Sequence, residues 1–223
     1  MGVKGGPDPD ETFHPYAVFH FDASNAIGNV SSTSFTNFLK TGSYTDWTIP
    51  SANANISGTG VSKALITISH NGNYNSLRAS GTFNQITSYT WSGIFLGGST
   101  TNDNKILRPN DATNFSIQAN GKFLYEGAGI LHTSSGSGLT STTWKHLLFV
   151  RSNTSCNLYV NNEVFYTFTL SSNYTSTDSD FRMNSYPGST VTCGYLMYWH
   201  NYALSASEIQ REYDKLKRRF SLP

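Results

Sequence analysis

The sequence has few charges. Charged residues make up 13% of its 223 residues, and the formal net charge is +1. A charge this weak creates no field that would gather a polyanion, so we expect no nucleic-acid partner. No stretch approaches the roughly 20 apolar residues of a membrane-spanning helix, so we also expect no membrane partner. Residues 1–10 lack the apolar segment of a secretory signal, and we expect none.

Cysteine is scarce as well. The two cysteines are Cys156 and Cys193. A single disulfide between them could form in an oxidising compartment. Because no secretory signal is expected, we predict two buried free thiols instead.

The residue groupings of common active sites are also missing. The six histidines include no pair at metal-ligand spacing on one helix or strand. There is no Gly-x-Ser-x-Gly turn, no phosphate-binding loop and no Cys-x-x-Cys motif. We therefore predict no catalytic residue, and we interpret His146 and His200 as structural.

What the chain has in abundance is Ser, Thr, Asn, Gly and aromatic residues, the last at 14%. Short runs of aromatic and β-branched residues alternate with neutral polar turns, which is typical of an all-β protein. We count about thirteen short strands and one terminal helix. This pattern predicts two antiparallel sheets packed face to face, with no domain boundary between them.

The stretch 144–170 is the most regular part of the chain. Its first strand is apolar on both faces, which predicts a position inside a sheet. Two turns follow, at 152–155 and at Asn161-Asn162, because Asn tolerates the positive φ of a tight hairpin. We therefore expect a three-stranded antiparallel meander. A second hairpin is predicted around Asn120-Gly121.

The C-terminal segment predicts the single helix. Ser205 and Glu208 have the spacing of a capping box, flanked by the apolar pair Leu204 and Ile209. One apolar stripe follows at helical spacing: Ile209, Tyr213, Leu216 and Phe220.

Three motifs together resemble the laminin-G-like family of concanavalin A-like jelly rolls. They are Phe-Asp-Ala-Ser-Asn at 21–25, Trp144-x-His146 followed by Leu-Tyr-Val-Asn-Asn-Glu at 158–163, and Ala-Leu-Ser-x-x-Glu-Ile-x-x-x-Tyr at 203–213. Asn162 stands where the family usually has Gly. The resemblance spans about residues 16–220. It implies one antiparallel two-sheet sandwich at 16–223, preceded by an N-terminal arm at 1–15. The arm could be a disordered tail or lie on a neighbouring subunit.

The resemblance also bears on chemistry. Related glucanases of this fold use a Glu-x-Asp-x-x-Glu strand, and none of the five Glu residues of this chain lies in such a strand. Laminin-G-like domains often hold Ca²⁺ in rim loops, and Asp103 and Asp111 are the candidate ligands here. The alternative is that both are solvated turn residues.

Aromatic side chains on a face or rim could bind a sugar. The candidates for glycan binding are Tyr44, Trp47, Tyr74 and Tyr186. The alternative is that these residues belong to the core.

Two functions from different classes follow. The first is a non-enzymatic virion structural protein, a capsid decoration, cement or tail-associated module. Its partners would be a major capsid or tail protein and further copies of itself, and it would be assembled in the host cytoplasm. The second is a carbohydrate-binding lectin domain, extracellular or on a viral fibre, with Ca²⁺ as an optional cofactor. A degenerate glycoside hydrolase is a third hypothesis.

Overall fold

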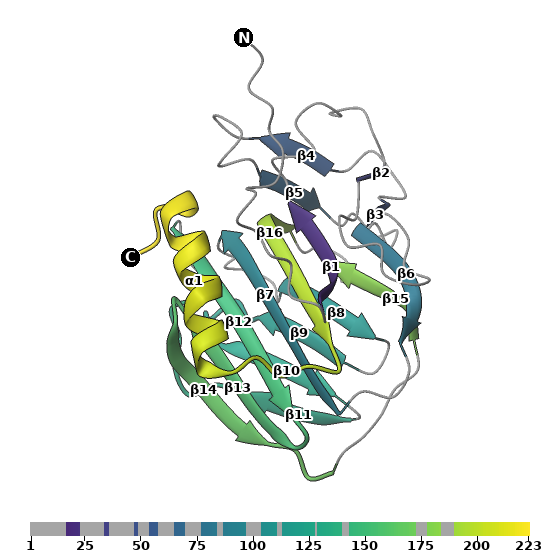
Figure 1. The fold of residues 1–223 in the computed structure, drawn as a ribbon, viewed down its shortest axis with the longest axis vertical. Helices are drawn as coiled ribbons and strands as arrows, with labels where there is room; N and C mark the ends of the chain where they lie inside the picture. The colour runs from purple at the N-terminus through teal and green to yellow at the C-terminus, as the bar shows by residue number, and fades with distance from the viewer. Residues whose placement is uncertain are drawn as a thin grey trace.

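The computed structural model describes most of the β-sandwich and all of the C-terminal helix (Figure 1). The described residues are 17–22, 34–35, 47–48, 54–57, 65–69, 77–83, 87–96, 104–110, 113–127, 129–139, 143–172, 178–183 and 190–223. The predicted arm at 1–15 lies outside them.

The strands form two antiparallel sheets. Sheet A has the order β14-β13-β12-β7-β16-β5-β4, with β1 also paired to β16. Its strands are β1 (Ala17–Asp22), β4 (Ala54–Ser57), β5 (Leu65–Ser69), β7 (Ser88–Leu96), β12 (Trp144–Ser152), β13 (Ser155–Val160), β14 (Glu163–Thr169) and β16 (Thr190–His200).

Sheet B has the order β11-β10-β9-β8-β15-β6-β3-β2. Its strands are β2 (Ser34–Phe35), β3 (Trp47–Thr48), β6 (Leu77–Phe83), β8 (Asn104–Asn110), β9 (Thr113–Ile117), β10 (Phe123–Gly127), β11 (Ile130–Thr133) and β15 (Asp178–Met183). The predicted all-β, two-sheet antiparallel sandwich with one C-terminal helix is therefore confirmed.

Two apolar layers hold the structure together. The first lies between the sheets and is mostly aromatic, with Trp91 and Phe149 from sheet A and Phe115 from sheet B all fully buried. The second lies on the outer face of sheet A, where α1 (Ala206–Phe220) packs over it. β12 serves both layers: Phe149 points to the first and Leu148 to the second. This confirms the strand predicted to be buried on both faces.

The predicted meander is present, and its turns follow from asparagine. β13 and β14 are joined by Asn161 and Asn162, whose φ angles are 50° and 71°. Both angles lie in the left-handed region, as a two-residue type I′ turn requires. Asn162 can therefore take the place of glycine.

The second predicted hairpin is present with a different turn. β9 ends at Ile117 and β10 begins at Phe123. The Gly121 N–H donates to Gln118 O at 2.8 Å, and Gly121 alone has a positive φ, of 77°. This is a type I turn closed by a glycine bulge, not a two-residue Asn-Gly turn. The side-chain oxygen of Asn120 accepts a hydrogen bond from the Lys122 N–H, at 3.0 Å.

Strand β16 departs from the alternation of side chains expected of a regular strand. Simple alternation predicts that Cys193, Tyr195 and Met197 share one face of β16. A β-bulge interrupts the pairing of β16 with β7 between Cys193 and Tyr195. Cys193 therefore points between the sheets, while Tyr195 and Met197 point towards α1. A bulge adds one residue and so inverts the alternation beyond it.

Gly93, at the centre of β7, is required by close packing. A Cβ placed on it would lie 2.4 Å from Cε2 of Phe95, whose ring is packed in the core at 6.3 Å from Trp91. Gly93→Ala is therefore expected to destabilise the fold by about 2 kcal/mol through overpacking. Urea unfolding would measure this, with Gly136→Ala as a milder comparison. An unchanged midpoint would show that Phe95 can move aside.

The capping box of α1 is present. The Glu208 carboxylate accepts hydrogen bonds from the Ser205 backbone N–H at 2.8 Å and from its hydroxyl at 2.7 Å. The predicted apolar stripe is buried against sheet A. At the other end, Ser221 adopts a left-handed conformation with φ of 51°, and the Leu222 N–H donates to Lys217 O at 3.1 Å. This turns the tail back towards the sheet.

Candidate functional site

A buried polar cluster lies beneath α1. The Ser92 hydroxyl from β7 donates to Glu212 Oε1 of α1 at 3.0 Å, and it lies 2.9 Å from His146 Nε2 of β12. Because the Ser92 proton goes to Glu212, the histidine must be the donor to Ser92 Oγ. Ser92 and His146 are fully buried and Glu212 is nearly so.

The residue types of this cluster resemble those of a hydrolase, but the geometry does not. In a Ser-His-acid triad the acid holds the histidine, which then takes the serine proton. Here Glu212 contacts Ser92 and not His146, and burial lowers the pKa of His146 to about 3. α1 also covers the cluster. We therefore assign the cluster a structural role, which agrees with the sequence-based interpretation of His146.

Both cysteines are buried and free, as predicted. Burial raises the pKa of the Cys156 thiol to about 12, although the nearby Arg151 acts in the opposite direction. A thiol with so high a pKa carries almost no thiolate at neutral pH. Cys156 is therefore a packing residue and not a nucleophile.

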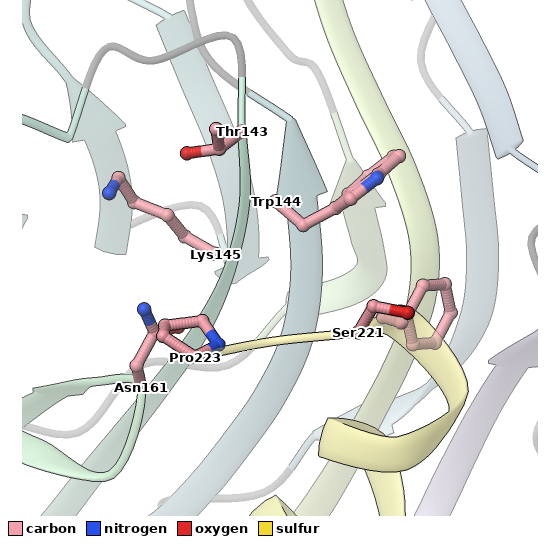
Figure 2. A pocket seen from close by; sticks show the side chains of 7 residues that line it. Thr143, Trp144, Lys145, Asn161, Ser221 and Pro223 are labelled. Carbon is pink, nitrogen blue, oxygen red and sulfur yellow. The ribbon is translucent and has the colours of Figure 1, made fainter.

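An open pocket of about 520 Å³ lies where the tail of α1 meets the start of β12. Figure 2 shows its lining residues from close by. They come from three separate segments: Thr143, Trp144 and Lys145; Asn161; and Phe220, Ser221 and Pro223. We call this site the Trp144 pocket.

Local structure fixes each part of the Trp144 pocket. The Trp144 ring is half-buried and packs beside Phe220, with ring centroids 6.0 Å apart. Asn161 is held by two bonds to His146: its N–H donates to the His146 carbonyl at 2.9 Å, and its Oδ1 accepts from the His146 N–H at 3.0 Å. The Tyr213 hydroxyl donates to the Pro223 carbonyl and so fixes the tail.

This arrangement can bind a small polar molecule with one apolar face. Trp144 lines the pocket with an aromatic side chain, and Thr143, Asn161 and Lys145 line it with polar side chains; Lys145 leaves β12 on the side opposite to Trp144 (Figure 2). An aromatic surface with a few convergent polar groups is typical of a ligand site.

Of the sequence-predicted site residues, the structure describes Trp47 alone. Trp47 forms β3, where its backbone pairs with Phe35 of β2. The other candidates lie outside the described residues: Tyr44, Tyr74, Asp103, Asp111 and Tyr186. The predicted Ca²⁺ ligands and all four glycan candidates therefore remain predictions. Sequence reasoning missed the Trp144 pocket because it treated Trp144 only as the start of a strand.

The part of the chain that the structure describes offers neither a metal-ligand group nor a membrane-spanning helix. No three His, Cys, Asp or Glu residues there are grouped as metal ligands. No helix within the described ranges is long and apolar enough to cross a membrane.

Comparison by sequence gives no relatives: no family model and no curated protein matches the chain. Comparison by structure gives several similar proteins. The binding domain of Paraclostridial Mosquitocidal Protein 1 superposes with a TM-score of 0.69 at 13% identity, over 90% of this chain and 52% of that one. The receptor binding domain of botulinum neurotoxin D gives a TM-score of 0.66 at 10% identity, over 90% and 52%.

The binding domain of botulinum neurotoxin DC, solved in complex with SialylT, gives a TM-score of 0.64 at 9% identity, over 90% of this chain and 51% of that one. This chain thus spans about half the length of the structures it resembles. At such low identity the likeness shows a shared β-sandwich fold. These three neighbours are described as binding or receptor binding domains.

Proposed function

We propose that this protein is a non-enzymatic binding module that recognises a glycan through the Trp144 pocket. The observation that carries the proposal is one open pocket lined by a half-buried tryptophan together with the amide of Asn161 and the hydroxyl residues Thr143 and Ser221. The similarity in fold to toxin receptor-binding domains supports it, and one of those was solved with SialylT bound.

The pocket would act by stacking and hydrogen bonding. The C–H face of a sugar ring is apolar and would pack against the Trp144 indole. Thr143 and the Asn161 amide would bind hydroxyl groups of that sugar, and Lys145, on the other side of β12, would bind a further part of the glycan. Because Asn161 is fixed by its bonds to His146, it would lose little conformational freedom on binding.

Removing the aromatic surface should therefore weaken binding. Trp144→Ala is expected to reduce affinity for the best ligand at least about tenfold, which is about 1.4 kcal/mol. Trp144→Phe should retain part of it, because a smaller ring still packs beside Phe220. A glycan array would find the ligand, and titration calorimetry would measure each variant.

A matched pair of lysine variants controls for charge. Lys145→Ala should weaken binding, whereas Lys122→Ala, in the β9–β10 turn of sheet B, should not. Thermal unfolding of each variant separates lost binding from lost folding. Full affinity in Trp144→Ala with the native fold intact would refute the proposal.

The virion hypothesis stays a prediction from the sequence. Two apolar side chains on the sandwich surface are consistent with contact to another subunit: Leu131 on edge strand β11 and Val164 on edge strand β14 are 64% and 62% exposed. Mass spectrometry of purified particles would test it. Absence of this chain from the particles would remove the virion role and leave the glycan proposal intact.

A further inference from the structure

Lys145 of β12 is a half-buried cation at the wall of the Trp144 pocket. Within the described ranges, no salt bridge joins its ammonium group to a carboxylate. Two other half-buried lysines each have such a partner. Lys105 Nζ lies 3.6 Å from the Glu126 carboxylate, and Lys215 Nζ lies 3.9 Å from the Glu212 carboxylate. A partly buried charge without an opposite charge is unfavourable, so an anion from outside the chain would stabilise Lys145.

Strand geometry places Lys145 on the face of β12 opposite to Trp144. The pairing of β12 with β7 runs without a register shift from Trp144 to Ser152, so the alternation of side chains holds along the whole strand. Trp144 packs with the residues beneath α1, whereas Leu147, two residues beyond Lys145, points between the sheets. Figure 2 shows the side chains of Lys145 and Asn161 on one side of β12 and the Trp144 ring on the other. The pocket therefore has an aromatic side and a polar side.

The polar side of the pocket is rich in hydrogen-bond donors. The Lys145 ammonium group has three N–H donors and no acceptor. The Asn161 Oδ1 accepts from the His146 backbone N–H at 3.0 Å, and this bond fixes which end of the amide is the oxygen. The amide NH₂ of Asn161 is then the end that a ligand can use. None of the seven residues that line the pocket is acidic, so a ligand on this side must supply acceptors.

The surroundings of the pocket are basic, although the whole chain has a formal net charge of only +1. The last turn of α1 carries three basic residues: Lys217, Arg218 and Arg219. Lys217 Nζ lies 5.5 Å from the centre of the Tyr213 ring, and the Tyr213 hydroxyl donates to the carbonyl of Pro223 in the pocket wall. The helix dipole favours cations in a last turn even without a ligand. It does not account for Lys145, which belongs to a strand.

We propose that Lys145 binds a carboxylate or sulfate group on the glycan that packs against Trp144, which makes the Trp144 pocket selective for acidic glycans. The inference rests on the proposed function and adds the charge of the ligand to it. A hydrogen bond from an ammonium group to an oxyanion is about twice as strong as one between neutral groups. Because an ammonium group acts as a compact point charge, it suits a carboxylate and a sulfate alike. A membrane surface would need a broad basic field with apolar anchors.

A glycan array that carries neutral glycans beside their sialylated and sulfated counterparts tests this selectivity. We expect the acidic member of a pair to bind at least about tenfold more tightly than the neutral member. The sialylated and sulfated arms separate a carboxylate from a sulfate as the source of the charge. Titration calorimetry with the best-bound pair gives the ratio of the two affinities.

Matched variants then locate the selectivity at Lys145. Lys145→Gln should lose at least about tenfold in affinity for the acidic member and much less for the neutral one, whereas Lys122→Gln should keep the ratio. Lys145→Arg keeps the charge and should retain the preference, which guards against misfolding. Asn161→Asp keeps the Oδ1 acceptor for His146 but replaces the amide donors with a carboxylate, so it should also lose the preference. Thermal unfolding of each variant checks its fold.

The results that would overturn the inference are distinct from those that would overturn the proposed function. Equal affinity for both members of every pair overturns the inference alone, provided that Trp144→Ala still weakens both. A preference that survives Lys145→Gln, or falls equally in Lys122→Gln, also overturns it. Binding of an oligoglutamate peptide or of phosphatidylserine vesicles in place of the acidic glycans would overturn it in favour of an acidic protein or a membrane. Binding of no glycan at all removes both.

Discussion

Replacing Phe149 with alanine is expected to lower the free energy of unfolding by about 4 kcal/mol, the typical cost of removing a buried phenylalanine. Phe149 lies in the middle of β12 and has no exposed surface. Six aromatic rings surround it at centroid distances of 4.7 to 6.4 Å: Tyr89, Trp91, Phe115, Phe123, Tyr125 and Phe168. They come from both sheets, so the loss would loosen the contact between the two layers.

Urea unfolding followed by tryptophan fluorescence would measure this effect. Phe149→Leu keeps most of the volume and should cost clearly less, because it leaves a smaller cavity. Leu131→Ala serves as the surface control, since Leu131 is 64% exposed. A loss below about 1 kcal/mol for Phe149→Ala would contradict the packing described for the core.

The second large expected effect is a loss of folding stability at acidic pH. Burial lowers the pKa of His146 from 6.5 to about 3 in the folded protein. Between these values the unfolded chain binds a proton that the folded chain does not, so stability falls as the pH falls. The ring lies against the buried residues Ser92 and Tyr213, and Ser92 in turn donates to Glu212. From about pH 7 to about pH 4, His146 alone should remove about 3 kcal/mol of stability.

His146→Gln isolates this contribution. Glutamine can still hydrogen bond to Ser92 but does not titrate, so the variant should lose about 3 kcal/mol less than the parent over the same pH interval. Burial also lowers the pKa of His200 and of His132, and these contributions are common to both proteins. Parallel stability curves for parent and variant would show that His146 takes up a proton in the folded state.

The features that the sequence predicts correctly depend on neighbouring residues. The capping box and apolar stripe of α1 lie within 16 residues of one another, from Ser205 to Phe220. The Asn161-Asn162 turn depends on two residues and their tolerance of positive φ. The apolar residues on both faces of β12 likewise mark it as an inner strand.

The features that the sequence misses depend on distant residues or on small irregularities. No pattern in 190–200 marks the bulge of β16, which is visible only in its pairing with β7. β11 is short, with four residues, and within the described ranges it pairs with β10 alone. Glu212 looks like an exposed helix residue until Ser92, 120 residues away, is seen beside it.

The candidate functional site also depends on residues that are distant in the sequence. The Trp144 pocket joins residues from 143–145, 161, 220–221 and 223. The glycan candidates Tyr44, Trp47, Tyr74 and Tyr186 stay predictions, because sequence cannot tell which aromatic residues meet polar groups at a surface. Strand register and the path of the tail supply that information.

The central claim is that the sandwich works by binding a glycan at the Trp144 pocket. Mapping the chemical shifts of the protein by NMR while the best glycan from the array is added tests this claim most directly. The largest changes should fall on the Trp144 indole, the Asn161 amide and Lys145. Saturable changes confined to residues away from the pocket, or no change with any glycan, would contradict it.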